Sequence, residues 1–433
     1  MHDETAHADT PDRIFGRGAT DQDLSIGDQR TIIEDSLDSV PAEARVLAII
    51  PDKTREDTTD VLFPIAAAVL ARIGASKLDV LVAQGTHPPM TQAEKLRKIG
   101  ISDLAVLPLP GQIFDHKWDD PEHLITIGTL EADEVERITG GLVARAVPLT
   151  VNALLARGKY DSILIFGATV PHEVVGFAGG AKYFFPGVSG RELTNITHWV
   201  GALAGIENTI GRIDTAPRRL INAAAAHIRQ QVICFTSVVS KSEDGGLRTH
   251  ALFGGDHLLS FARAAEVSRK VHIRYVFRKY KRVIAMLPPH YDDLWVGGKA
   301  SYKLGGVIEN GGELIIFAPH LREISATHGR LIKRFGYAPM STVQDWVAAD
   351  EELQANLSIA AHLTHVAFGS YIDEHGSTQP RYKITLSSGI DAQTCSQINL
   401  RYLAPRNFDL NQYLSDPDTL VVHDAGRELY MTR

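Results

Sequence analysis

Two histidines and one lysine stand in a single glycine-rich stretch, residues 170–199, which reads VPHEVVGFAGGAKYFFPGVSGRELTNITHW. His172 lies ten residues before Lys182, and His198 lies sixteen residues after it. A partly buried lysine can lose its proton and act as a nucleophile, and a neutral imidazole suits nickel, copper, zinc or iron. The stretch is no phosphate-binding P-loop, because the Gly-Lys-[Ser/Thr] ending is missing. A loop that turns often and carries polar groups is the plainer alternative.

Two further polar motifs each follow an apolar run. In Asp52-Lys-Thr54-Arg55, Arg55 could clamp a carboxylate and Asp52 could hold a ribose hydroxyl. Asp52 or Thr54 could equally cap a helix. His87, in Gly-Thr-His-Pro, could be a general base because imidazole titrates near neutrality, or it could be only solvated.

A third motif lies far along the chain, Trp295-Val-Gly-Gly-Lys299. Lys299 could pair with an anionic substrate, although a surface lysine would read the same way. His290, His320 and His328 are each best interpreted as structural or solvated.

The elements that must position these motifs are buried strands alternating with helices. Apolar runs predict strands at 46–50 and 161–166 and in KLDVLVAQGTH (77–87), which runs into a Gly-Thr-His turn; helical spacing predicts a helix at 60–73. We expect a mostly parallel sheet from this order. The polar motifs then follow the carboxyl ends of its strands, where open α/β sheets bind ligands. A helix at 149–156 and a strand at 364–371 are also predicted.

The strand–helix pattern starts again near residue 275. A strand at 283–287 is followed by a helix at 293–310 that glycines interrupt, and then by another strand at 312–319. The sequence therefore predicts two α/β domains, 1–274 for cofactor binding and catalysis and 275–433 as a second domain. The active site is expected in the cleft between them.

Composition narrows the classes of function. The chain has 433 residues and a net charge of −8 without a long basic run, which argues against nucleic acid as a partner. Its only cysteines, Cys234 and Cys395, have no Cys-x-x-Cys partner, so Cys-based zinc sites and disulfide frameworks are not expected. No run approaches the roughly 18 apolar residues of a membrane span. The polar start lacks a secretory signal, and we expect a cytoplasmic protein.

Taken together, the motifs DKTR, GTH, PHEVVGFAGGAKYFFPG and the histidine that follows resemble the nickel-dependent lactate racemase family. The resemblance extends roughly over residues 40–370 and is densest at 162–199. It implies a nickel-pincer nucleotide, which is pyridinium-3,5-bisthiocarboxylic acid mononucleotide carrying nickel, covalently attached at Lys182. His198 would supply a metal ligand. Separate cofactor-maturation proteins would be partners.

Other residues receive roles from the same resemblance. Asp52, Thr54 and the Gly179–Gly180 turn would hold the nucleotide, with Trp295 nearby. The acid/base pair would be His87 and His172, and Arg55 and Lys299 would bind the substrate carboxylate. The implied activity is that of an isomerase, a 2-hydroxy acid racemase or epimerase working by proton abstraction and reversible hydride transfer to the cofactor.

The sequence departs from the family pattern near the expected substrate pocket. Where family members resemble Tyr-Gln-x-x-Lys, this chain has Trp295-Val296-Gly-Gly-Lys299, and Pro88 stands where Arg is frequent. These changes favour a 2-hydroxy acid other than lactate. The alternatives are a sugar-acid epimerase, a 2-hydroxy acid dehydrogenase, or a non-catalytic binding relative of the same fold. The oligomeric state is left open.

Overall fold

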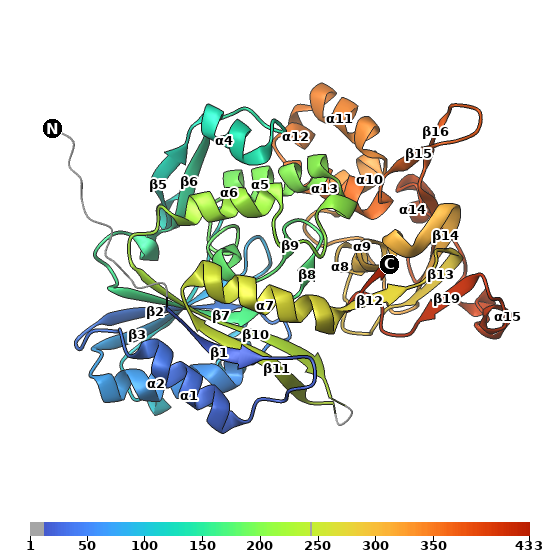
Figure 1. The fold of residues 1–433 in the computed structure, drawn as a ribbon. Coiled ribbons are helices and arrows are strands. Elements are labelled where there is room, and N and C mark those ends of the chain that lie inside the picture. The colour runs from blue at the N-terminus through green and yellow to red at the C-terminus, as the bar shows by residue number, and fades with distance from the viewer. Residues whose placement is uncertain (1–12, 243–244) are drawn as a thin grey trace. The chain divides into compact units, whose positions relative to one another are not determined.

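The computed structural model describes residues 13–242 and 245–433 (Figure 1). The polar start, on which the prediction of no secretory signal depends, lies outside the described residues. Among the described residues, no helix is long and apolar enough to cross a membrane. The chain divides into two compact units. Unit 1 comprises residues 1–170, 177–194 and 218–271, and unit 2 comprises 171–176, 195–217 and 272–433.

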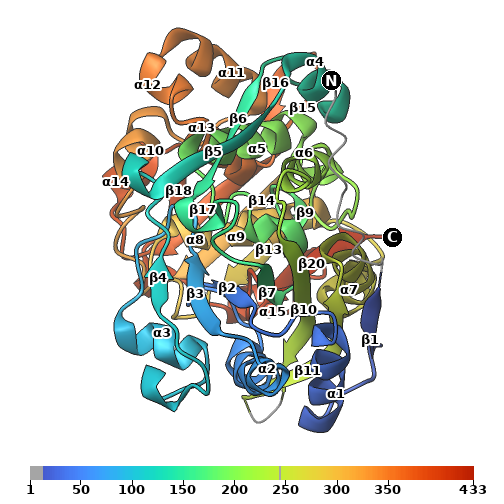
Figure 2. The ribbon, with the colours of Figure 1, turned by 90° about the vertical axis from the view of Figure 1, so that its left-hand side faces the viewer.

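Unit 1 is built on a seven-stranded sheet of order β1-β11-β10-β7-β2-β3-β4. Its strands are β1 (Ile14–Gly18), β2 (Arg45–Pro51), β3 (Lys77–Ala83), β4 (Ile113–Asp115), β7 (Ser162–Ala168), β10 (Gln231–Lys241) and β11 (Leu247–Gly255). The pairs from β10 to β4 are parallel, whereas β11 runs antiparallel to both β10 and β1. Figure 2 shows β4, β3, β2, β7 and β10 in this order. The predicted mostly parallel sheet is confirmed.

Helices cover both faces of this sheet, and the alternation of side chains along β11 shows how. Leu252 packs with the cluster under α1 (Ile26–Leu37) and α2 (Thr59–Ile73), while its neighbours Ala251 and Phe253 pack with Ala264 of α7 (His257–His272). Successive strand residues point to opposite faces, so one apolar strand serves two helical layers.

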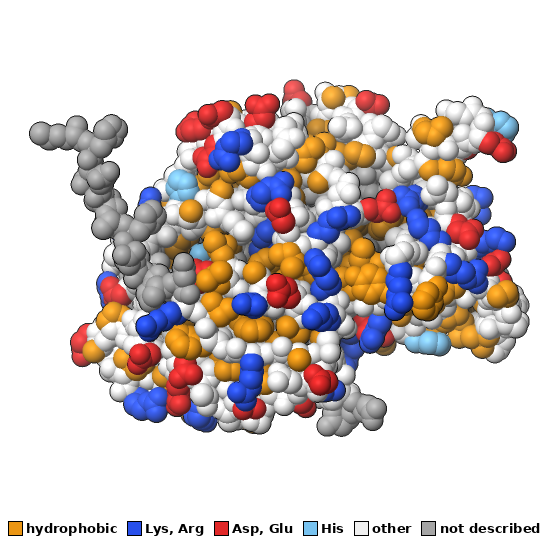
Figure 3. Space-filling model, in the orientation of Figure 1, with side chains coloured by type: hydrophobic (Ala, Val, Ile, Leu, Met, Phe, Trp, Pro, Cys, Tyr) orange, Lys and Arg blue, Asp and Glu red, His pale blue; other side chains and the backbone are white. Residues whose placement is uncertain are grey.

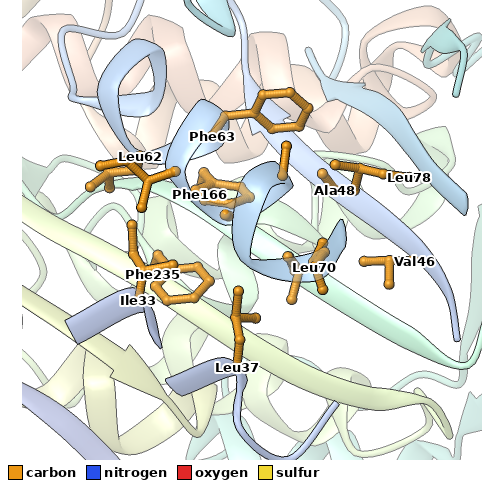
Figure 4. Close-up of a cluster of buried hydrophobic side chains, with 14 of the residues drawn as sticks. Ile33, Leu37, Val46, Ala48, Leu62, Phe63, Leu70, Leu78, Phe166 and Phe235 are labelled. Carbon is orange, nitrogen blue, oxygen red and sulfur yellow. The ribbon is translucent and has the colours of Figure 1, made fainter. Parts of the chain in front are cut away.

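A large apolar cluster packs against the strands that carry the polar loops (Figure 4). Phe166 of β7 stacks on Phe235 of β10, with ring centroids 5.2 Å apart, and meets Phe63 of α2 edge-on at 6.0 Å. All three rings are fully buried. Close packing of this kind fixes the ends of β2 and β7, because buried side chains have few alternative rotamers.

The rest of unit 1 consists of short elements. These are α3 (Gln92–Lys98), α4 (Ala132–Thr139) and an antiparallel pair, β5 (Leu124–Leu130) with β6 (Val147–Asn152). Helix α3 begins with the expected capping box, since Thr91 and Glu94 each bond the other's backbone N–H. Helices α5 (Arg191–Ala204) and α6 (Ala216–Ala225) each pass from one unit into the other.

Unit 2 contains a second, five-stranded sheet of order β18-β17-β14-β13-β19, in which every pair is parallel. Its strands are β13 (Tyr280–Met286), β14 (Ile308–Ala318), β17 (Tyr382–Ser388), β18 (Arg401–Tyr402) and β19 (Thr419–Val422). Three short strand pairs accompany it: β8 (Pro171–His172) with β9 (Gly176–Phe177), β12 (Ile273–Val276) with β20 (Leu429–Thr432), and β15 (Ser370–Ile372) with β16 (Thr378–Pro380). The helices are α8 (Leu294–Gly297), α9 (Lys299–Leu304), α10 (Gly329–Phe335), α11 (Met340–Ala349), α12 (Glu351–Gln354), α13 (Leu357–Ala367), α14 (Ala392–Gln397) and α15 (Asn411–Leu414).

Two expected elements are wrong. Of residues 149–156, expected as a helix, the first half belongs to strand β6, because pairing with β5 and the β-branched Thr150 and Val151 favour an extended chain, and Ala153–Leu155 form only a short 3₁₀ turn. Residues 364–371, expected as a strand, are mostly the end of helix α13. The apolar run there is too long for a strand and lacks its alternation. The helix ends at Phe368, whose φ of 58° is left-handed, and strand β15 follows.

Neither unit is continuous along the chain. The long C-terminal part of unit 2 begins at His272, and residues 171–176 and 195–217 also belong to unit 2. Consequently His172 and His198 lie in unit 2, while Lys182 between them in sequence lies in unit 1.

Candidate active site

Strand order places the loop after β2 at a favourable position. From β2 the chain builds β3 and β4 on one side and returns to place β7 on the other, so β2 and β7 are neighbours at a topological switch point. In open α/β sheets the crevice outside the strand ends at such a point is where ligands bind. Asp52, Thr54 and Arg55 follow β2 directly, and Thr169 follows β7.

Asp52 and His87 form a tight pair in this loop region. The Asp52 carboxylate lies 2.6 Å from Nδ1 of His87, and its other oxygen accepts from the Thr54 backbone N–H at 2.9 Å and from the Thr54 hydroxyl at 2.6 Å. Burial alone would raise the pKa of Asp52, but the hydrogen bond and charge of His87 outweigh burial and hold the pKa below its ordinary range. The charge of Arg55 acts in the same direction.

His87 keeps access to solvent while its orientation is fixed. Its side chain is 39% exposed, whereas that of Asp52 is 6% exposed. A carboxylate on Nδ1 sets the tautomer and leaves Nε2 to exchange a proton with a ligand. Gln84 holds the turn before the histidine. Its backbone carbonyl accepts from the His87 N–H, and its side-chain amide donates to the His87 carbonyl. The arrangement can therefore perform general acid/base chemistry.

The glycines before Lys182 form a turn that no other residue fits. Gly179 and Gly180 have φ values of 103° and 59°, in the region that favours glycine. A Cβ on Gly179 would lie 2.3 Å from the Thr169 hydroxyl, and one on Gly180 would lie 2.9 Å from Cβ of Phe261. Lys182 follows in a short 3₁₀ turn and is partly buried.

A buried arginine, which no sequence motif had indicated, holds this turn from behind. The guanidinium of Arg218 donates to the backbone carbonyls of Phe177 and Gly179 and lies 4.0 Å over the ring of Phe261. Burial lowers the pKa of Arg218 to about 9, still well above neutrality. Because the charged guanidinium binds two carbonyls of this segment, it fixes the backbone of the glycine turn.

The remaining predicted site residues lie in unit 2. The imidazole Nδ1 of His172 accepts from the backbone N–H of Val174 at 3.1 Å, which orients the ring. The ammonium of Lys303 donates to the carbonyl of Pro171 at 2.5 Å and fixes the same short strand. Lys299 begins α9 with its Nζ 5.0 Å from the ring centroid of Tyr291.

Trp295 stands between two imidazoles. Its ring centroid is 4.4 Å from that of His328 and 3.9 Å from that of His362, and the second pair is stacked. His328 was interpreted as structural or solvated, and the structure places it against the indole. His362 and His365 of α13 were not singled out from the sequence; His365 lies in the stretch 364–371 that was expected to be a strand, and His362 lies just before it. The i, i+3 spacing of the two histidines on a helix would have been the signal.

Glu173 supplies a buried charge next to these rings. Burial would raise its pKa, but its backbone hydrogen bond and the charges of Lys303 and Lys299 hold the pKa of Glu173 below its ordinary value. Burial lowers the pKa of His365 to about 4, and it lowers the pKa of His362 well below its ordinary value.

The donor set bears on the metal that the sequence suggested. Among the described residues, no group of three or more His, Cys, Asp or Glu side chains is arranged to hold a metal ion. An ion bound at His198 would therefore draw most of its donors from a non-protein group.

Comparison with known proteins agrees with the fold. Residues 29–210 match the family model of the lactate racemase N-terminal domain. A Thermotoga maritima crystal structure from a structural genomics consortium is similar at a TM-score of 0.85 and 28% identity, covering 96% of this chain and 100% of that one. The lactate racemase apoprotein of Thermoanaerobacterium thermosaccharolyticum has the same fold, at a TM-score of 0.71 and 16% identity over 97% of this chain and 94% of that one. No curated protein sequence matches significantly. The chain thus has the fold of lactate racemase, and its residues 29–210 are similar to the N-terminal domain of that family.

Proposed function

We propose that this protein is a 2-hydroxy acid racemase or epimerase that uses a nickel-pincer nucleotide bound to Lys182. The observation that carries the proposal is the Asp52–His87 pair at the switch point of the mostly parallel sheet. This pair lies within the residues that match the lactate racemase N-terminal domain. The bound nickel cofactor would supply a reversible hydride acceptor.

The chain's own residues then have separate tasks. His87, oriented by Asp52, takes the proton from the C2 hydroxyl through Nε2. His172, whose ring is oriented by the Val174 N–H on Nδ1, would serve the opposite enantiomer. Two bases are needed because each enantiomer presents its hydroxyl to a different side. Arg55 and Lys299 would bind the carboxylate.

The residues that would hold the cofactor are also distinct. Lys182 would form its covalent attachment, and His198 would provide one nickel ligand. The Gly179–Gly180 turn, which packs so closely against Thr169 and Phe261 that neither glycine has space for a Cβ, would hold the nucleotide. Thr54 and Trp295 would lie beside the bound group.

The surface is consistent with a small-molecule substrate. On the face shown in Figure 3, Lys and Arg side chains are interspersed with Asp and Glu and gather into no continuous basic patch. Proteins that bind nucleic acid usually present such a patch.

The test is the intact mass and nickel content of the protein expressed together with cofactor-maturation proteins. The expected result is the added mass of the cofactor on Lys182 and about one nickel per chain, as a single histidine ligand per site implies. Chiral chromatography should then show inversion at C2 of a 2-hydroxy acid. A Lys182→Ala protein that retained cofactor and activity would contradict the proposal. An unmodified protein, under conditions in which a known racemase is loaded, would favour a non-catalytic binding relative.

A further inference from the structure

Three neighbouring side chains in unit 2 each bury a polar atom that has no hydrogen-bond partner among the described residues. These atoms are the hydroxyl of Tyr337, Nε2 of His362 and Nε2 of His365. The three residues are between 3% and 5% exposed. The Tyr337 and His362 rings lie 5.7 Å apart, and His365 follows one helical turn after His362 on α13. We call these three residues the α13 cluster.

The other polar atoms of the two imidazoles are occupied, which fixes their rings. Nδ1 of His362 is 2.6 Å from the hydroxyl of Tyr302. His365 hydrogen-bonds the Gly201 backbone, and because its Nε2 has no partner, the bond runs through Nδ1. Each ring is thus held by one nitrogen, and its other nitrogen has no partner among the residues that the structure describes.

Unpartnered buried polar atoms are costly and uncommon, and three together call for an explanation. A neutral imidazole offers either an N–H or a lone pair at Nε2, and a phenol offers both a donor and an acceptor. Hydroxyl groups, which both donate and accept, match such atoms. A second carboxylate on the ligand, in addition to the one at C1, would not match, because the buried and ionised Glu173 lies beside His365 and would repel it.

The α13 cluster contacts the first residue of the predicted substrate motif, Trp295-Val-Gly-Gly-Lys299. Trp295 stacks on His362 with the centroids 3.9 Å apart, and the indole is itself only partly buried. A hydroxylated chain could reach the cluster if the indole moved off the imidazole. This is also the motif in which the chain departs from the lactate racemase pattern.

We propose that the α13 cluster binds hydroxyl groups on the part of the substrate beyond C2, and that the substrate is therefore a polyhydroxylated 2-hydroxy acid. This inference rests on the proposed function for the identity of the C2 end. The cluster residues are specificity residues and do not touch the reacting atoms. The Trp295 indole, which stacks on His362, would have to move for the substrate to reach these residues.

The experiment compares two six-carbon acids on the full-length protein by titration calorimetry. The probes are D-gluconate, which is hydroxylated along its length, and 2-hydroxyhexanoate, which is not; 2-hydroxyglutarate tests a second carboxylate. We expect gluconate to bind at least about tenfold more tightly than either of the others, since two or more hydrogen bonds to buried groups are at stake. Binding should change tryptophan fluorescence, and Trp295→Phe should remove that change. Equal affinities for the two six-carbon acids, or no binding of gluconate, overturn the proposal.

A single-atom variant separates a ligand from a buried water. Tyr337→Phe removes only the unpartnered hydroxyl, so we expect an unchanged or higher melting temperature and about tenfold weaker gluconate binding, with no effect on 2-hydroxyhexanoate. Tyr382→Phe is the matched control, because that hydroxyl lies 2.7 Å from the hydroxyl of Ser301. It should lower the melting temperature and leave the affinity ratio unchanged. If Tyr337→Phe behaves like Tyr382→Phe, a water satisfies the tyrosine and the proposal is wrong.

The outcomes also separate this inference from the proposed function. Tight gluconate binding without inversion at C2 would contradict the racemase and keep the α13 cluster as a hydroxyl-binding site. Inversion at C2 with equal affinity for both six-carbon acids would keep the racemase and contradict the inference.

Discussion

The polar residues near Asp52 in unit 1 and the α13 cluster in unit 2 differ in how their hydrogen bonds are used. Asp52 places one carboxylate oxygen on His87 and the other on Thr54. In the α13 cluster, by contrast, Tyr337, His362 and His365 each leave a buried polar atom unused among the described residues. A group that orients a base must be fully engaged before the ligand arrives, whereas a group that selects a ligand must keep bonds to offer.

The pKa shifts follow the same division. The partners of Asp52 favour its charged form and overcome burial, whereas burial dominates in the α13 cluster and keeps both imidazoles uncharged. The first region is thus prepared to stabilise charge, and the second to recognise neutral groups. Single substitutions can alter one member of this comparison at a time.

The largest effect is expected at the base itself. His87→Asn should lower kcat by about 10²–10⁴-fold, because general-base catalysis typically contributes that much. Cofactor loading and nickel content should not change, since Lys182 and His198 are untouched. The measurement is C2 inversion by chiral chromatography on protein whose cofactor content is known. Full activity in this variant would remove His87 from the mechanism.

The orienting carboxylate should matter less than the base. Asp52→Asn keeps the size of the side chain but loses the charge that holds His87, and a loss of about 10- to 100-fold in kcat is expected, as for other groups that act through a catalytic neighbour. Restoring a carboxylate with Asp52→Glu should recover part of the rate. A change in KM alone would indicate a binding role for Asp52.

The pH dependence gives a second measurement on Asp52. Its folded pKa is lowered, so its contribution to stability is present above the unfolded pKa near 3.8 and is lost as the pH falls through the lower folded value. The wild type should therefore keep this advantage over Asp52→Asn near pH 4 and lose it only in stronger acid. Denaturant unfolding of both proteins across this range would show it.

Sequence alone predicted the strands that carry the first region. The runs at 46–50, in KLDVLVAQGTH (77–87) and at 161–166 correspond to β2, β3 and β7, since buried parallel strands are short and continuously apolar. The polar residues that follow them could be recognised because strand ends limit where a loop begins. That Asp52 pairs with His87 could not be predicted, because the two residues are 35 positions apart and the pairing depends on side-chain direction.

The second region was not predictable in the same way. Helix α13 is apolar over most of its length, so its residues fitted a strand as well as a helix, and the histidines within it were overlooked. Missing partners are also invisible in a sequence, because a buried and bonded histidine and a buried unbonded one have the same letter. Only the three-dimensional contacts distinguish the two hydroxyls of Tyr302 and Tyr337.

As the pH is lowered, the contribution of His365 in unit 2 to stability should change at a higher pH than the contribution of Asp52. Burial lowers the folded pKa of His365 to about 4, so between about pH 6.5 and pH 4 the unfolded chain binds a proton that the folded chain does not. Stability should fall over this range by on the order of 1–3 kcal/mol as the pH is lowered. Burial also lowers the pKa of His116 in unit 1 to about 4, so His116 contributes to the loss of stability in the same direction.

Substitution separates the two histidines. A His365→Gln protein should show a shallower decline in melting temperature between pH 6.5 and pH 4 than the wild type, and His116→Gln should show a similar change. If His365→Gln leaves the slope unchanged while His116→Gln reduces it, His365 is protonated in the fold and pairs with Glu173. The α13 cluster would then carry charge, and a ligand with an anionic group would suit it better than hydroxyls.

The smallest effect is expected for Tyr302, whose hydroxyl is hydrogen-bonded to His362 of the α13 cluster. Tyr302→Phe removes the partner of Nδ1 in His362, which leaves a second buried nitrogen on that ring unsatisfied, and a loss of about 1 kcal/mol in unfolding free energy is expected. Tyr337→Phe removes an equally buried hydroxyl without a partner and should cost nothing. Equal losses would mean that both hydroxyls are bonded in solution, and the contrast between the two regions would disappear. A loss confined to Tyr302→Phe would show that the unused atoms of the α13 cluster are unused because the free protein has nothing to offer them.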